Sequence, residues 1–270
     1  MPELPDLEAI KAVLNSKIAG VKIVRVEMMQ PLVIRQPDLK EFEAVCTGNR
    51  FIDVNRRGKF LLFNLESKHI LAMHFMLTGR LQYCGTRENR KPKTCFIFHL
   101  EDGKQLRYFD SKLMGKIYLV EKGRFYTIPR WNEMGPDALD DDMTLDVFRS
   151  RIKPYSGQIK NVLLNDTFLT GIGNAYADEI LFEAGIYPFW PGTSLSHEEV
   201  GALYNAMRSV LIKAVDTVSN RMRDDITTEV RDFLKVHRRG GKPCPACGGP
   251  ISQVQANRRI TSFCRNCQKA

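Results

Sequence analysis

The spacing of apolar residues divides the first half of the chain into two kinds of segment. Between residues 5 and 19 they recur every three or four positions, which predicts an amphipathic helix that Gly20 can end. From about residue 21 to 121 the pattern changes to short apolar runs separated by turn residues. The predicted strands include Val21–Met28, Phe60–Glu66, Ile70–Met76, Cys95–Leu100, Gln105–Phe109 and Lys116–Glu121. Many short strands without helices between them favour an antiparallel β-sandwich.

The second half of the chain has helical periodicity. Residues 127–143, rich in Pro, Gly and Asp, are predicted to form a linker. Asn174 is a candidate N-cap for a helix over Ala175–Ala184. Ser196-His197-Glu198-Glu199 has the spacing of a capping box and opens a long amphipathic helix. The charged, weakly periodic stretch Ser219–Glu229 is predicted to be a flexible connection.

Length and composition narrow the class of protein. At 270 residues the chain exceeds the usual size of a single core, which predicts two domains plus a small C-terminal module. No apolar run approaches the ~20 residues of a membrane helix, and the N-terminus lacks the pattern of a signal peptide. Cys46, Cys84 and Cys95 are scattered through apolar stretches and are predicted to be reduced core thiols, which fits a cytoplasmic protein.

The C-terminal segment has the spacing of a zinc site. Cys244-x2-Cys247 and Cys264-x2-Cys267 can place four thiolates around one structural Zn²⁺. Residues 238–270 contain no Asp or Glu and contribute +7 of the formal net charge of +9. Their basic residues are Arg238, Arg239, Lys242, Arg258, Arg259, Arg265 and Lys269. A basic zinc ribbon favours contact with nucleic acid, whereas the alternative is a structural knob whose charge is incidental.

The N-terminus offers a candidate nucleophile. Removal of Met1 would leave Pro2 with a terminal secondary amine, and an α-amino group has a pKa of about 8, against ~10.4 for lysine. Such an amine can attack an aldehyde-like carbon and form an iminium, with the adjacent Glu3 as acid or base. Many chains begin Met-Pro, so the alternative is an ordinary terminus.

Three further motifs carry weaker signals. Gly171-Ile172-Gly173-Asn174 precedes a helix and could hold a phosphate, or it could be a tight turn between helices. Arg56-Arg57-Gly58-Lys59 is a basic turn that could also bind phosphate, although such turns are usually solvated surface. Met76-Leu77-Thr78-Gly79-Arg80 places an apolar side chain at a turn, although a methionine is more often part of a core.

Together these motifs resemble the formamidopyrimidine-DNA glycosylase/endonuclease VIII family. The resemblance runs from the N-terminus to the zinc ribbon. The segments that carry it are Pro2-Glu3-Leu4-Pro5, Arg57-Gly58-Lys59-Phe60-Leu61, His74-Phe75-Met76-Leu77-Thr78-Gly79, Gly171-Ile172-Gly173-Asn174-Ala175-Tyr176-Ala177 and Arg259-Ile260-Thr261-Ser262-Phe263-Cys264. Agreement at all five sites in this order is very improbable by chance.

The resemblance implies a fold and a function. The expected fold is α+β with several domains: an N-terminal helix and antiparallel β-sandwich over residues 1–126, the linker 127–143, a helix–two-turn–helix domain over 144–237 and a zinc finger over 238–270. The expected activity is that of a bifunctional DNA glycosylase/AP lyase of base excision repair. Such an enzyme would act as a monomer on damaged double-stranded DNA, away from membranes, in the nucleoid region of the cytoplasm.

The resemblance also implies residue roles. Pro2 would attack C1′ of the damaged nucleoside, and Glu3 would assist as acid. Lys59 and Arg259 would act at the catalytic site, where they and Asn174 would hold phosphates. Met76 would fill the gap left by the extruded base. Further expected DNA contacts are His74, Lys93, Lys112 and Tyr176, although His74 has a structural histidine as its alternative.

The departures from the family concern substrate choice. Many members have an Arg-Arg-Phe run on a sandwich loop where this chain reads Asp110-Ser111-Lys112-Leu113-Met114-Gly115. Lys112 lacks the planar fork of an arginine, so discrimination of the base opposite the lesion is expected to be weak unless Arg80 or Arg107 takes over. The short Ser219–Glu229 stretch would leave the base pocket open. These changes suggest a rival reading, a DNA-damage-binding protein that keeps the fold without catalysis.

Overall fold

The computed structural model describes residues 1–256 and 259–269, so Arg258 and Ala270 lie outside the described residues. The chain forms two compact units. Unit 1 comprises residues 1–132 and 217–230, and unit 2 comprises residues 133–216 and 231–270. None of the described helices is long and apolar enough to cross a membrane.

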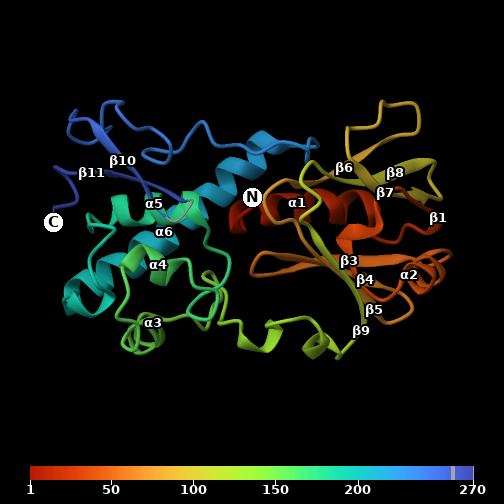
Figure 1. Cartoon of the computed structure of the whole chain (residues 1–270), viewed down its shortest axis with the longest axis horizontal. Helices are drawn as coiled ribbons and strands as arrows, with labels where there is room; N and C mark the ends of the chain where they lie inside the picture. Colours follow the sequence, from red (N-terminus) through yellow and green to blue (C-terminus); the bar gives the residue numbers. More distant parts are fainter. Residues whose placement is uncertain (257–258, 270) are drawn as a thin grey trace. The chain divides into compact units, whose positions relative to one another are not determined.

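Unit 1 is a β-sandwich accompanied by two helices (Figure 1). Its helices are α1 (Leu4–Ile18) and α2 (Leu39–Cys46), with 3-10 turns at Pro31–Val33, Phe125–Thr127 and Trp131–Glu133. The strands are β1 (Ile23–Met28), β2 (Ile34–Gln36), β3 (Phe51–Arg57), β4 (Phe60–Leu65), β5 (His69–His74), β6 (Gly79–Gly85), β7 (Thr94–Leu100), β8 (Lys104–Asp110) and β9 (Lys116–Glu121). They form one sheet in the order β1-β7-β8-β6 and another in the order β2-β9-β5-β4-β3.

Aromatic side chains fill the core of unit 1. Phe42, Phe51, Phe63, Phe96 and Phe98 are fully buried and contact one another through ring centroids 5.1 to 6.4 Å apart. Because these rings come from α2 and from both sheets, they tie the layers of the sandwich together. The predicted sandwich is therefore confirmed, with one parallel pair, β2–β9, among antiparallel ones.

The predicted strands are present, but the short β2 and the longer β3 and β6 are not among the strands named from the sequence. Strand β3 buries only Phe51 and Val54 fully, three positions apart, so its sequence lacks the alternation of a half-exposed strand. Strand β6 begins and ends with glycine, which favours a turn. Cys46, Cys84 and Cys95 are buried and free, as predicted, and desolvation raises the pKa values of Cys46 and Cys95 to about 12.

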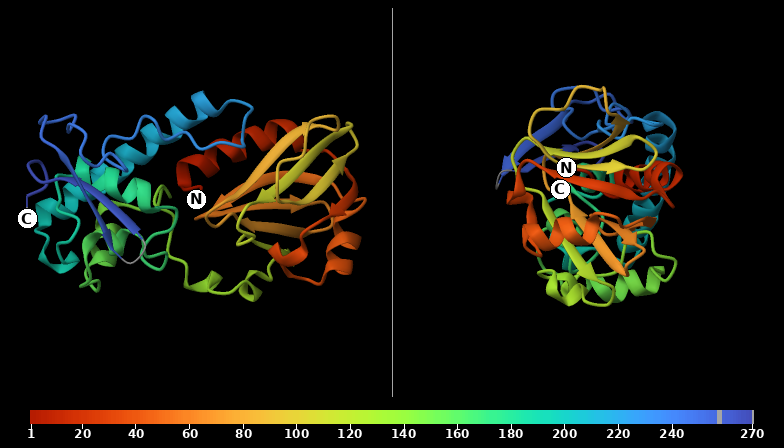
Figure 2. Two further views of the ribbon diagram at one scale, coloured as in Figure 1. Left: turned by 45° about the horizontal axis from the view of Figure 1, so that its top comes forward. Right: turned by 90° about the vertical axis from the view of Figure 1, so that its right-hand side faces the viewer.

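Unit 2 contains several helices and a C-terminal pair of antiparallel strands (Figures 1 and 2). Its elements are α3 (Leu145–Ile152), α4 (Ile159–Leu163), α5 (Asn174–Glu183), a 3-10 turn at Gly192–Ser194, β10 (Ile251–Ala256) and β11 (Arg259–Cys264). Strands β10 and β11, together with the four predicted zinc ligands, are called the zinc hairpin. Helix α6 (His197–Met222) begins in unit 2 and ends in unit 1. Its predicted capping box is confirmed, since Ser196 N donates to Glu199 Oε2 (2.7 Å) and Glu199 N donates to Ser196 Oγ (3.2 Å).

Two local predictions were wrong. Asn174 is the first residue of α5 rather than its cap, because Gly173 occupies the N-cap position and the Asn174 amide donates to Ile260 O (2.8 Å). The stretch Ser219–Glu229 is not a flexible connection. Its first four residues complete α6, and Ile226 is fully buried in unit 1.

Candidate functional site

The N-terminal motif lies at the start of α1 in unit 1. Pro2 and Glu3 are buried, and Glu3 is the N-cap residue of α1. Glu3 N donates to Asp6 Oδ2 (2.8 Å) as one half of a capping box. Asp6 thus holds the backbone of Glu3, the predicted acid. This arrangement fixes the first residues of the chain on a rigid helix end.

The basic turn between β3 and β4 holds Lys59. Gly58 has a φ of +56°, which only glycine adopts readily, so the chain turns sharply before Lys59. Arg56 Nε forms an ion pair with Glu8 Oε1 (2.6 Å), and the Arg57 guanidinium lies 4.6 Å above the Trp131 ring. Burial opposes ionisation of Glu8, but Arg56 and Lys11 outweigh it and lower the Glu8 pKa. The two arginines are thereby used in anchoring the turn, and Lys59 itself is 8% exposed.

The β5–β6 turn carries the predicted Met76 and a second apolar residue, Leu77. Met76 is half-buried with a φ of +50°, and its N–H donates to His74 Nδ1 (3.1 Å). The next residue, Leu77, is 46% exposed. His74 also packs edge-on against Phe60, 4.9 Å between ring centroids. His74 therefore supports the turn, and Leu77 is its most exposed apolar side chain.

A buried carboxylate connects this turn to the β8–β9 loop. Asp110 accepts hydrogen bonds from the Thr78 hydroxyl, Lys112 N (3.1 Å) and Gly115 N (2.7 Å). The side chains of Lys112 and Met114 are exposed on this loop. Asp110 thus ties the two loops together, and their exposed side chains include the apolar Leu77 and Met114 and the cationic Lys112.

The β5–β6 turn ends at Gly79 and the β8–β9 loop ends at Gly115, and neither position has room for a side chain. A Cβ atom on Gly79 would lie 2.3 Å from the Tyr108 hydroxyl, and one on Gly115 would lie 1.9 Å from it. Tyr108 is fully buried, and burial raises its pKa. The close approach of both backbones to one tyrosine explains why neither position accommodates a side chain.

Two other cations of the sandwich differ in exposure: the side chain of Lys93 faces solvent, and that of Arg107 is buried. Lys93 has an exposed side chain and a φ of +58°, and its carbonyl accepts Asp110 N (3.0 Å). Arg107 is fully buried, and its guanidinium donates to Gln105 Oε1 and to the carbonyls of Gly85, Glu88 and Asn89. The expectation that Arg107 could read a base is therefore wrong, since its donors hold the β6–β7 loop.

In unit 2, the zinc hairpin is attached to α4 and α5. Lys160 Nζ donates to Ile260 O (2.8 Å) and Thr261 Oγ1 (2.9 Å), and it forms an ion pair with Asp178 Oδ1 (2.6 Å). The other Asp178 oxygen contacts His237 Nδ1 (2.7 Å). These contacts and that of Asn174 fix the backbone immediately after Arg259, whose side chain is exposed.

These buried charges were not identified from the sequence. Lys160 and Asp178 are almost fully buried within short helices. Glu179, beside Asp178, accepts the backbone N–H groups of Lys235, Val236 and His237 at 2.7 to 2.8 Å. The sequence feature that indicates such a cluster is Asp178-Glu179, a pair of acidic residues in a largely apolar helix. Buried charges require partners, so a pair of this kind predicts cationic or N–H groups packed against it.

Tyr176 occupies the interior of unit 2. Its side chain is fully buried, its hydroxyl accepts a hydrogen bond from Arg231 Nη1 (2.9 Å), and the Arg231 guanidinium lies 5.0 Å from its ring. The side chain of Tyr176 thus serves packing inside unit 2.

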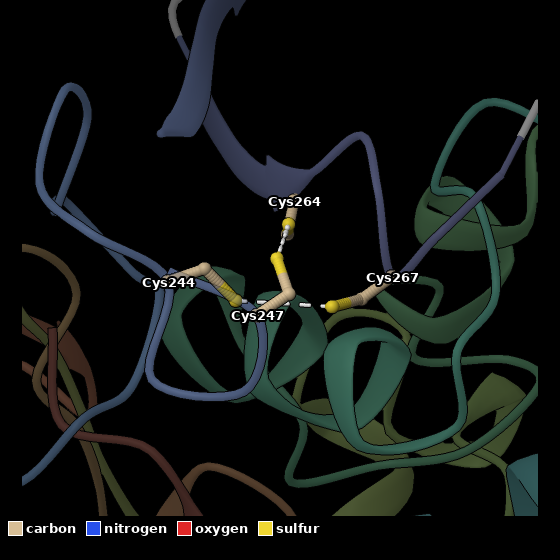
Figure 3. Close-up of side chains that lie close together, drawn as sticks. All are labelled: Cys244, Cys247, Cys264 and Cys267. Carbon is tan, nitrogen blue, oxygen red and sulfur yellow. Dashed lines mark hydrogen bonds between the residues drawn. The ribbon is translucent and has the colours of Figure 1, made fainter. Parts of the chain in front are cut away.

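The four predicted zinc ligands lie together and point toward one another (Figure 3). All four Sγ atoms lie within 4.8 Å of one another, and the Cys244–Cys267 and Cys247–Cys264 pairs are 3.8 and 3.5 Å apart. A tetrahedron with Zn–S bonds of about 2.3 Å has edges of about 3.8 Å, so the thiol set fits a structural Zn²⁺.

The surroundings of the cysteines agree with a metal centre. The Gly249 N–H lowers the pKa of Cys247 to about 7, whereas desolvation and the neighbouring thiols raise that of Cys267 to about 12. Four clustered thiolates repel one another, and a divalent cation removes that cost. Cys244 and Cys264 also belong to an apolar cluster with Phe182, Val236 and Ile251, so the zinc centre is continuous with the packing against α5.

Three sequence profiles match successive parts of the chain. The formamidopyrimidine-DNA glycosylase N-terminal domain matches residues 1–117, the formamidopyrimidine-DNA glycosylase H2TH domain residues 134–225, and the zinc finger found in FPG and IleRS residues 241–270.

Full-length relatives match as well. The formamidopyrimidine-DNA glycosylase of Pelotomaculum thermopropionicum is 36% identical over 100% of this chain and 99% of its own length, and that of Moorella thermoacetica is 38% identical over 94% and 95%. The fold is similar to that of Lactococcus lactis Fpg in complex with DNA containing an abasic site (TM-score 0.91, 25% identity, 99% of this chain and 100% of that one). It is also similar to the same protein with DNA containing N7-benzyl-Fapy-dG (TM-score 0.92, 26% identity, 100% of both chains).

Proposed function

The chain belongs to the formamidopyrimidine-DNA glycosylase family, and from this membership we propose which residues carry each step of its reaction. As a member it is a bifunctional DNA glycosylase/AP lyase that acts on oxidised purines and formamidopyrimidine lesions in damaged double-stranded DNA. The observation that supports this assignment most is the similarity over the whole length of the chain.

Pro2 is the proposed nucleophile once Met1 has been removed. Its secondary amine would attack C1′ of the damaged nucleoside, and the base would leave with the electrons of the glycosidic bond. Opening of the sugar ring then gives an iminium, and elimination from it breaks the strand. Glu3 would supply the proton for ring opening, and its fixed position at the start of α1 supports that role.

The proposed phosphate contacts come from both units. Lys59 contributes from unit 1, where the anchored β3–β4 turn supports a fixed position for its ammonium. Asn174 and Arg259 contribute from unit 2, and the contacts to Ile260 and Thr261 support a fixed backbone next to Arg259. The exposed Lys93 and Lys112 add charge on the sandwich, and binding should therefore weaken with salt.

The β5–β6 turn is the proposed wedge that replaces the extruded base. Its exposed Leu77 supports a wedge formed by Leu77 together with the predicted Met76, and Met114 is exposed on the loop that Asp110 ties to this turn. His74 would act mainly by holding the turn, in keeping with its bond to Met76 N. Tyr176 would contribute to DNA contact through the backbone of the α5 N-terminus rather than through its buried side chain.

The structural Zn²⁺ would be held by Cys244, Cys247, Cys264 and Cys267. It would supply no reaction chemistry, since four protein thiolates complete its coordination. The proposed domains are the N-terminal β-sandwich domain over residues 1–126, the linker 127–143, the helix–two-turn–helix domain over 144–237 and the zinc finger over 238–270. The proposed state is a monomer acting on DNA in the cytoplasm.

A cleavage assay tests this function against the rival of a non-catalytic damage binder. Duplexes that carry an abasic site or a ring-opened purine should be cut at the lesion by the zinc-loaded protein. Binding of the same duplexes without cleavage would support the rival, and undamaged duplex is the control.

A further inference from the structure

A third acidic side chain lies beside the N-terminus of unit 1. Glu229 Oε1 lies 3.0 Å from the α-amine of Met1 and 2.6 Å from Arg80 Nη2. All three side chains are largely buried, with exposed fractions of 26% for Met1, 24% for Glu229 and 16% for Arg80. None of the roles assigned above uses Glu229.

The segment that carries Glu229 is held against unit 1. Ile226 and Met222 are buried, and Asp224 forms an ion pair with Lys17 of α1 at 3.2 Å. On the other side of the carboxylate, Arg80 Nη1 donates to Gly79 O (2.6 Å), which fixes the guanidinium that holds Glu229. The carboxylate is therefore positioned by contacts on both sides before any DNA binds.

Removal of Met1 keeps the new terminus close to this carboxylate. The nitrogens of Met1 and Pro2 are joined through Cα and C, which spans at most about 3.7 Å. The Pro2 amine would thus lie within about 7 Å of Glu229 Oε1, a distance that one water or a change of side-chain rotamer closes.

We propose that Glu229 is an electrostatic positioning residue for the terminal amine, an inference that rests on Pro2 being the nucleophile. When the Pro2 nitrogen bonds to C1′ and the base leaves with the bonding pair, the nitrogen becomes cationic. It then releases its proton, and its lone pair displaces the ring oxygen, which takes up a proton, so that the iminium again carries a positive charge. The Glu229 carboxylate stabilises that charge at each stage.

The same carboxylate also stabilises the protonated, unreactive amine. Loss of its charge should therefore favour the neutral, reactive amine. Replacing Glu229 by glutamine should thus have two effects that a structural role would not combine. The maximal rate should fall, while the acidic limb of the pH profile should move to lower pH.

The test is single-turnover borohydride trapping on an abasic duplex between about pH 5 and about pH 9. Glu229→Gln is compared with wild type and with Asp224→Asn, which removes a charge from the same segment but is paired with Lys17. Mass spectrometry verifies Met1 removal in each protein, and thermal unfolding verifies folding. The other charged groups in contact with this segment or adjoining the terminus, Glu3, Asp6, Lys17 and Arg80, are the same in all three proteins.

We expect Glu229→Gln to lower the plateau rate about tenfold and to move the acidic limb down by about half to one pH unit. Asp224→Asn should match wild type in both. An unchanged profile in Glu229→Gln, or a lower plateau with an unmoved acidic limb, would overturn the proposal. Absence of any adduct in wild type at every pH would instead refute Pro2 as the nucleophile, and the inference would fall with it.

Discussion

At the scale of single residues, the contacts of three cations of the sandwich indicate which of them is available to the base opposite the lesion. Arg107 donates to a side chain and three backbone carbonyls inside the protein, and Arg80 is paired with Glu229. Lys112 is exposed on the loop that Asp110 holds next to Leu77. Lys112 is thus left as the main candidate for contact with the opposite base.

The resulting prediction concerns opposite-base discrimination. A bidentate arginine contact provides roughly 1–3 kcal/mol of discrimination, and a flexible ammonium lacks its fork. Single-turnover excision should therefore vary less than about tenfold among the four opposite bases, the rate equivalent of ~1.4 kcal/mol. Lys112→Arg should widen that range. A strong preference of the wild type for cytosine opposite 8-oxoguanine would contradict this prediction.

Residues whose chemistry depends on local spacing could be identified from the sequence. The four cysteines are the clearest case, because two short pairs define the whole ligand set. Residues whose bonding partners come from distant segments could not be assigned their contacts from the sequence. Asn174 looks like a helix cap in sequence, but its amide is bonded to Ile260, and Arg107 looks like a surface cation although it is buried.

At the scale of elements, the attachment of the zinc hairpin depends on a buried ionic cluster. Asp178 on α5 contacts Lys160 of α4, His237 and the backbone N–H of Ser262 in β11. Breaking a buried ion pair is costly because it leaves a charge without its partner. The cluster therefore couples α4, α5 and β11 into one support for Arg259.

Asp178→Asn is the corresponding prediction. It should lower the unfolding free energy of unit 2 by about 3 kcal/mol and weaken DNA binding. Glu183→Gln is the matched control on the same helix, because its exposed pair with Lys235 (2.7 Å) should contribute less than about 1 kcal/mol. Chemical unfolding and DNA titration measure both. Equal losses of unfolding free energy in the two variants would show that the buried cluster stabilises unit 2 no more than an exposed ion pair does.

Most element types followed from periodicity, and the misses have physical causes. Strand β6 begins at Gly79, which the packing of Tyr108 requires, and ends at Gly85, and glycine at both ends favours a turn over a strand. The stretch Ser219–Glu229 is charged in sequence, yet α6 continues to Met222 and Ile226 inserts into unit 1. Tertiary packing supplied the order that local propensity did not indicate.

At the scale of the whole molecule, the positive charge is concentrated in the zinc module. Residues 238–270 carry +7 of the net +9, and the four cysteines adjoin the apolar cluster of Phe182, Val236 and Ile251. Binding of Zn²⁺ and folding of such a module are coupled, with apparent binding free energies of about 10–16 kcal/mol. The sandwich has its own aromatic core within unit 1.

Metal removal should therefore affect the two units differently. Chelation or Cys244→Ser should unfold the zinc hairpin and weaken DNA binding, while the β-sheet signal of the sandwich persists. Circular dichroism, zinc content and DNA titration at fixed salt measure these effects. Unchanged DNA affinity in metal-free protein would show that the module makes no DNA contact.

Covalent trapping tests most directly whether the N-terminal proline performs the chemistry. Zinc-loaded protein is incubated with an abasic duplex and borohydride, and the adduct is mapped by mass spectrometry. We expect one adduct on Pro2 of the Met1-free chain. Pro2→Gly or retention of Met1 should reduce the adduct sharply, because both changes remove the terminal secondary amine, and lysine side chains with a pKa of ~10.4 are largely protonated at neutral pH. An adduct on Lys59 in the wild type would contradict the account.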